Sequence, residues 1–164
     1  VECWLRFKPD ERLIIAGEGP LKKKLEAKSA GAGNIEWLGQ ISRDAILERL
    51  STAKALLFPT KCYEGQPLIL LEAMSVGCPV ITSGIGNPKN MISDDETGFL
   101  YKPGDIDDLN RKCRMICDNH AHTLEMGKRA RSVYLDRYTP EKNLSLLTEI
   151  YDKAAELEKM LNRS

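Results

Sequence analysis

No stretch of this sequence approaches the about 20 consecutive apolar residues that a helix needs to cross a bilayer, and no signal peptide is visible. An excess of positive charge is also lacking, since 24 Lys and Arg residues balance 24 Asp and Glu residues. A broad nucleic-acid-binding surface normally needs such an excess, so we expect no nucleic-acid partner. A small anion site stays open, because a few backbone N–H groups can hold a phosphate without net charge.

The five cysteines include no C-x-x-C pair, and their odd number fits no disulfide framework. This pattern is typical of a reducing compartment, so we expect a cytoplasmic protein, with the cytoplasmic face of a membrane left open. Cys113 and Cys117 are expected to be small buried side chains rather than metal ligands. His120 and His122 lie in a polar stretch without a ligand partner at convincing spacing. We interpret them as part of a solvated loop and expect no metal site.

Short runs of apolar and β-branched residues alternate with helical patterns along the chain. This alternation predicts βαβ units, and so an α/β fold with a parallel, Rossmann-like sheet and flanking helices over residues 1–164. Ligands usually bind at the carboxyl ends of such strands. Strands are predicted at 12–16, 35–38, 55–59, 79–82 and 98–101, and helices at 20–28, 42–53, 67–76, 89–93, 105–118, 123–136 and 140–161.

Gly17 and Gly19 follow the first predicted strand and resemble the start of a dinucleotide-binding fingerprint. The expected third glycine is Lys22, and a lone G-x-G is a weak signal. A tight turn and direct ligand contact are therefore about equally favoured here. After the second strand, Ser42 is predicted to cap the next helix.

The loop after the third strand, residues 60–65, runs into the start of a predicted helix. Gly65 lets the backbone approach a ligand closely. The free N–H groups of the first helical turn and the positive end of the helix dipole favour a diphosphate. Pro67 has no N–H group, so Gln66 and Leu68 are the expected backbone donors.

Two carboxylates flank this helix start. Glu64 comes directly before it, and Glu72 lies two turns on, about 10 Å along the axis at ~1.5 Å per residue. The sugar and the ribose of a nucleotide sugar are separated by a comparable distance, and a carboxylate suits a vicinal diol. By spacing alone, a chance pair of surface glutamates remains the favoured interpretation.

The wider segment around the two glutamates changes this balance. Residues 62–82 read CYEGQPLILLEAMSVGCPVIT, which resembles the E-x7-E signature of family-4 glycosyltransferases, E-G-x-P followed by L-E-A-M-x-x-G-x-P-V. Other features of that family follow in order: IIAGEGPL at 14–21, IEWLG at 35–39, TGFL at 97–100, Pro103-Gly104-Asp105, and a closing helix with Tyr151. The resemblance covers nearly the whole chain.

The resemblance implies the carboxyl-terminal, donor-binding half of a GT-B fold in a retaining transferase. The donor would be a UDP- or GDP-sugar, and the acceptor a glycan or lipid-linked molecule held by the other domain. No cofactor or metal is expected. Asp105-Ile106-Asp107 imitates a metal-binding D-x-D but is interpreted as a helix cap. By position, the implied site consists of catalytic Glu64 with donor-binding Gly65, Gln66, Pro67, Leu68, Glu72, Ile41, Ser42, Gly17 and Gly19.

The chain departs from the family pattern in two places. After the fourth strand, residues 86–90 read GNPKN where the family has G-G-x-x-E. The family's donor domain also begins with a central strand and a loop that carries an Arg and a Lys for the diphosphate. This chain begins at Val1 with what we interpret as the tail of the following helix. We therefore expect a fragment that is inactive alone.

Two alternatives stay open. The chain can be a non-catalytic nucleotide-binding module, or part of another GT-B enzyme such as a sugar-nucleotide epimerase or a phosphorylase. The final helix, 140–161, is expected by default to pack against its own domain, although in the family it often crosses to the other domain. Peripheral association with a membrane also stays open.

Overall fold

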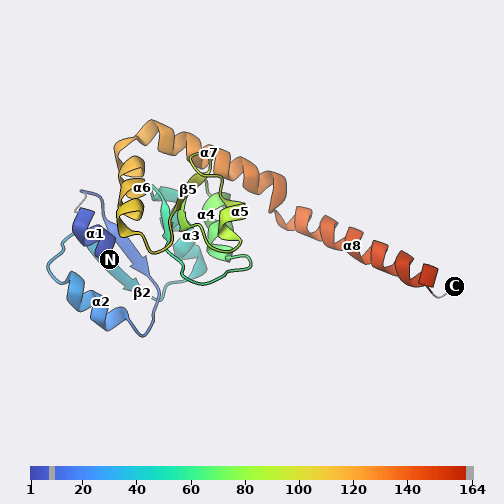
Figure 1. Ribbon diagram of the computed structural model, residues 1–164, viewed down its shortest axis with the longest axis horizontal. Coiled ribbons are helices and arrows are strands. Elements are labelled where there is room, and N and C mark those ends of the chain that lie inside the picture. Colours follow the sequence, from blue (N-terminus) through green and yellow to red (C-terminus); the bar gives the residue numbers. More distant parts are fainter. Residues whose placement is uncertain (8–9, 162–164) are drawn as a thin grey trace.

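The computed structural model describes residues 1–7 and 10–161. Strands and helices alternate along its first part, as predicted, and three helices close it (Figure 1). The elements are α1 (Glu2–Phe7), β1 (Leu13–Ala16), α2 (Lys22–Ser29), β2 (Ile35–Gly39), α3 (Arg43–Thr52), β3 (Leu56–Phe58), α4 (Leu68–Ser75), β4 (Val80–Ser83), α5 (Pro88–Met91), β5 (Gly98–Tyr101), α6 (Ile106–Asp118), α7 (His120–Arg137) and α8 (Pro140–Leu161).

All strand pairs are parallel, which confirms the predicted fold class, but the strands form two sheets. One sheet contains β1 and β2, and the other has the order β3-β4-β5. Within the described residues no ladder joins β1 to β3.

Side chains connect the two sheets where the backbone does not. The Lys54 Nζ atom, just before β3, lies 2.6 Å from the Glu11 Oε1 atom, just before β1. Leu13 of β1 and Leu57 of β3 pack against the same apolar cluster, whose buried members include Phe99. Both strands are only half-buried apart from exposed Ala16, whereas all of β4 is buried. The two sheets thus share a core without sharing a ladder.

Helices α4 and α7 pack closely on the three-stranded sheet. Leu70 and Met74 of α4 and Ala130 of α7 are completely buried in one cluster. A β-carbon added at Gly127 would overlap with the Gly77 carbonyl oxygen. This approach requires glycine and holds α7 against the turn that follows α4.

The structure corrects two expectations about the last helices. His120 and His122 lie in the first turn of α7, not in a loop, because the Asn119 side chain accepts a hydrogen bond from the His122 N–H group at 3.1 Å. Helix α8 does not pack on its own domain. None of its described residues is buried, and it extends away from the body of the molecule (Figure 1).

None of the helices among the described residues combines the length and the apolar character needed to cross a membrane.

Candidate functional site

The loops that follow the strands are connected to one another by specific contacts. The Gly17 N–H group, after β1, donates to the Gly39 carbonyl oxygen at the end of β2 at 2.6 Å. The Asn87 N–H group, after β4, donates to the Glu64 carbonyl oxygen, after β3, at 3.2 Å. The first contact joins the loop after β1 to the end of β2, and the second joins the loop after β3 to the loop after β4. Both lie at the carboxyl ends of the strands, where parallel sheets bind ligands.

The turn that was predicted to bind a phosphate lies at the start of α4. Helix α4 begins at Leu68, one residue later than predicted, and its N-cap residue is Pro67. Pro67 makes no side-chain cap, and no other side chain among the residues that the structure describes caps this turn. Gly65 and Gln66 are exposed, as is 71% of Leu68. The turn is therefore open to a ligand.

The loop after β4 holds the loop that carries Glu64. Gly86 has a left-handed φ of 65°, and a β-carbon there would lie 3.1 Å from the Glu64 nitrogen. The Ser83 hydroxyl also donates to the Thr60 carbonyl oxygen at 2.7 Å. Glu64 itself is half-buried, and its carboxylate has no hydrogen-bond partner or ion-pair partner among the described residues. Its backbone is fixed while its carboxylate remains available.

The second carboxylate, Glu72, has a partner that sequence reasoning missed. Its Oε1 atom accepts a hydrogen bond from the Arg43 Nε atom at 2.6 Å, and only 14% of its side chain is exposed. This hydrogen bond raises the pKa of the Arg43 guanidinium. Arg43 and Glu72 are 29 positions apart, so no local pattern signals their contact.

The turn after β2 is attached to α4 through this ion pair. Arg43 is the first residue of α3, directly after Ile41 and Ser42. Ser42 caps the helix, as predicted, because its hydroxyl oxygen accepts from the Ala45 N–H group at 3.2 Å. The pair therefore connects the turn with Ile41 and Ser42 to Glu72 of α4.

The loop after β1 is a tight turn. Gly17 has a φ of 122°, and a β-carbon added at either Gly17 or Gly19 would meet no atom within 4 Å. Beside them, the Lys22 Nζ atom lies 2.5 Å from the Glu18 Oε1 atom. This supports the turn interpretation, while ligand contact at Gly17 and Gly19 remains a prediction.

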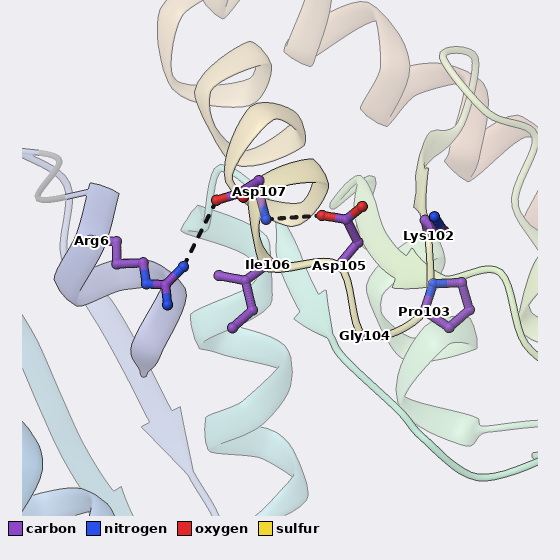
Figure 2. A pocket seen from close by; sticks show the side chains of 7 residues that line it. All are labelled: Arg6, Lys102, Pro103, Gly104, Asp105, Ile106 and Asp107. Carbon is purple, nitrogen blue, oxygen red and sulfur yellow. Dashed lines mark hydrogen bonds and ion pairs between the residues drawn. The ribbon is translucent and has the colours of Figure 1, made fainter.

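The loop after β5 borders a polar pocket of about 470 Å³ (Figure 2). Asp105 accepts hydrogen bonds from the Asp107 and Asp108 N–H groups at 3.1 and 3.0 Å, which confirms that it is a helix cap. Asp107 points instead toward Arg6, at 3.9 Å (Figure 2). The pocket is lined by Arg6, Lys102, Pro103, Gly104, Asp105, Ile106 and Asp107. Its two carboxylates are thus directed to protein groups.

Comparison with known proteins gives a consistent result. A family model described as glycosyl transferases group 1 matches residues 4–133. The chain is 31% identical over 126 residues to sulfoquinovosyl transferase SQD2 of Arabidopsis thaliana, and this match covers 75% of the chain and 24% of the relative. The chain spans from 24% to 35% of the length of the first curated relatives that it matches.

Two solved structures are similar in fold. Sucrose-phosphate synthase from Thermosynechococcus elongatus superimposes with a TM-score of 0.84 at 22% identity, over 95% of this chain and 42% of that one. HepE of Anabaena in complex with UDP-glucose gives a TM-score of 0.80 at 16% identity, over 94% of this chain and 43% of that one. Both comparisons concern the arrangement of strands and helices described above.

Proposed function

Because the chain belongs to the group 1 glycosyl transferases, whose family model matches residues 4–133, we propose that it is the nucleotide-sugar-binding domain of a retaining glycosyltransferase. Its Rossmann-like α/β fold is the one that GT-B glycosyltransferases share. The observation that carries the proposal is the uncapped first turn of α4, which follows Glu64 and precedes Glu72 in the sequence.

The proposed roles follow from the chemistry of each group. The diphosphate lies at the start of α4, where the N–H groups of Gln66 and Leu68 and the helix dipole offset its charge, and Gly65 allows close approach. Each charge-assisted hydrogen bond contributes on the order of 1.5–3 kcal/mol. These groups offset only part of the diphosphate charge, and the proposal includes no metal ion.

The carboxylates of Glu64 and Glu72 bind the sugar and the ribose of the donor, respectively. Glu72 accepts hydrogen bonds from the ribose hydroxyls, and Glu64 faces the donor sugar and acts in the transfer step. Backbone groups of Ile41 and Ser42 meet the base. A UDP-sugar is favoured by the likeness to HepE, which was solved with UDP-glucose, and a GDP-sugar is the alternative.

We further propose that the acceptor is a glycan or a lipid-linked molecule and that the protein works in the cytoplasm, with peripheral attachment to a membrane as one arrangement. Because the chain spans 24% of the relative SQD2, the acceptor would contact parts of the protein beyond those described here.

A binding experiment on the full-length protein tests the proposal. UDP, GDP and their sugars are titrated into the wild type and into the Glu72→Gln and Glu64→Gln variants. We expect Glu72→Gln to weaken nucleotide binding about tenfold, since a charged acceptor is lost. Glu64→Gln should retain nucleotide binding and lose transfer.

Glu48→Gln serves as the control, because Glu48 is an exposed glutamate on α3. Failure of every nucleotide sugar to bind the wild type would contradict the proposed function. Equal nucleotide affinity in the wild type and in Glu72→Gln would contradict only the ribose role.

A further inference from the structure

The contact between Arg43 and Glu72 joins α3 and α4, two helices that would contact different parts of one nucleotide. Arg43 is the first residue of α3 and directly follows the turn that contains Ile41 and Ser42. Glu72 lies within α4, past the turn proposed to hold the diphosphate. The Arg43 Nε atom donates to the Glu72 Oε1 atom at 2.6 Å.

The geometry leaves the carboxylate able to bind a ligand as well. An ionised carboxylate offers roughly four lone-pair positions on its two oxygens, and the Arg43 Nε atom uses one of them. The Oε2 atom has no hydrogen-bond partner among the described residues, so it remains free to accept from a hydroxyl. The planar guanidinium restricts how the carboxylate can rotate. Arg43 thus orients the Glu72 carboxylate and leaves its Oε2 atom able to accept a hydrogen bond.

Burial of the two partners is unequal, and this argues against a purely structural ion pair. The Arg43 side chain is 74% exposed, whereas Glu72 is 14% exposed. An ion pair with one partner in solvent contributes little to folding stability, because water screens it. Burial leaves the Glu72 carboxylate few orientations, and the hydrogen bond from the Arg43 Nε atom favours the one in which Oε1 faces Arg43.

We propose that Arg43 is a positioning residue that orients the Glu72 carboxylate toward the vicinal hydroxyls of a ribose, and so couples recognition of the base to recognition of the ribose. This inference rests on the proposed function, because it assumes that Glu72 meets the ribose of a nucleotide. It adds a residue to the site that neither the motif nor the first-turn geometry of α4 identifies.

The test measures preference for ribose rather than overall affinity. Dissociation constants are measured by calorimetry for UDP and for 2′,3′-dideoxy-UDP, with the guanosine pair used if GDP binds more tightly. The full-length wild type is compared with Arg43→Gln and Arg43→Lys. We expect Arg43→Gln to lower the preference for the ribose form about tenfold, the value of one well-oriented charged hydrogen bond.

Two readouts separate positioning from a structural effect. The affinity for pyrophosphate alone should stay unchanged in Arg43→Gln, because the diphosphate turn does not include Arg43. Arg43→Lys should restore part of the preference, since a cation remains but the planar donor is lost. The melting temperature of Arg43→Gln should fall by less than about 3 °C.

The matched control is Arg12→Gln, which removes another exposed arginine whose Nη1 atom lies 3.5 Å from the Glu36 Oε2 atom. An unchanged ribose preference in Arg43→Gln, or an equal loss in Arg12→Gln, would overturn the inference while the proposed function stands. If the wild type binds no nucleotide, the proposed function and this inference fall together. If Glu72→Gln loses the preference and Arg43→Gln keeps it, only the role of Arg43 is wrong.

Discussion

Gly86 lies directly against the backbone of Glu64: a β-carbon at Gly86 would stand 3.1 Å from the Glu64 nitrogen and 3.2 Å from its carbonyl oxygen. The Asn87 N–H group next to it donates to that same carbonyl oxygen at 3.2 Å. The family pattern has a second glycine where this chain has Asn87, so the contact shows which of the two positions requires glycine here. The first position, Gly86, requires glycine because its backbone lies close to the backbone of Glu64.

Replacing Gly86 with alanine should therefore disturb the position of Glu64. The left-handed φ of 65° costs a non-glycine residue about 1–2 kcal/mol, and the contact with Glu64 adds to this. We expect lower stability in denaturant unfolding and a lower kcat for transfer by the full-length protein.

Gly84→Ala is the control for this change. Gly84 lies in the same loop, has no left-handed φ, and its nearest contact would be the Tyr101 carbonyl oxygen at 3.9 Å. Similar losses in the two variants would show that the Gly86–Glu64 contact has no special importance.

Removing the Ser42 hydroxyl should destabilise the start of α3. Ser42→Ala loses the hydrogen bond accepted from the Ala45 N–H group at 3.2 Å, and N-cap losses typically cost about 1 kcal/mol. Urea unfolding should show this loss, and Ser42→Asp should recover most of it because aspartate also caps helices. An aspartate variant no more stable than the alanine variant would contradict the cap.

Gly127→Ala tests the close contact between α7 and the turn after α4. The added β-carbon would overlap with the Gly77 carbonyl oxygen, so the backbone must move. Overpacking of this kind costs about 1–3 kcal/mol or more, which lowers the melting temperature by several degrees. In Gly33→Ala the new β-carbon meets no atom within 4 Å, so the melting temperature should hardly change. Equal effects would contradict the close packing.

Asp108 should contribute to stability in a pH-dependent way. The hydrogen bond from the Lys102 N–H group, and then the Arg111 guanidinium, lower the pKa of its carboxyl group. A lowered folded-state pKa means that the contribution is fully present above the unfolded value of about 3.9 and is lost as pH falls through the folded value. The free energy of unfolding of the wild type should therefore exceed that of the Asp108→Asn variant by about 1 kcal/mol at pH 7.

The measurement is a series of urea unfolding curves for the wild type and Asp108→Asn. The difference between them should stay constant from about pH 7 to pH 5 and shrink below about pH 4. A difference that grows as pH falls would have the wrong sign for a lowered pKa.

Local signals predicted much of this fold. Each of the five strands in the structure begins and ends within two residues of its predicted bounds, because each apolar run is bounded by residues that break strands. Ser42 and Asp105 cap their helices as predicted, since a cap depends only on neighbouring backbone groups. The polar composition around His120 and His122 wrongly indicated a loop, because the cap at Asn119 outweighs it.

Contacts between distant segments were not predictable in the same way. Nothing in the sequence around Arg43 marks it as the partner of Glu72, and the need for Gly86 arises only where two loops meet. The spacing of apolar residues in α8 indicates an amphipathic helix but not what it contacts. In the structure, Leu144, Ile150 and Tyr151 of this helix are all more than half exposed.

The absence of a ladder between β1 and β3 in the described part of the chain affects which amide groups exchange together with solvent. Each sheet protects its own N–H groups, so the pair β1 and β2 can open as a separate cooperative unit while β3, β4 and β5 stay closed. The turn with Ile41 and Ser42 begins at the end of β2 and would open with it. A ligand held by this turn and by Glu72 would tie the two units together, so hydrogen exchange at Ile15 and Glu36, whose N–H groups face the partner strand, should slow on nucleotide binding.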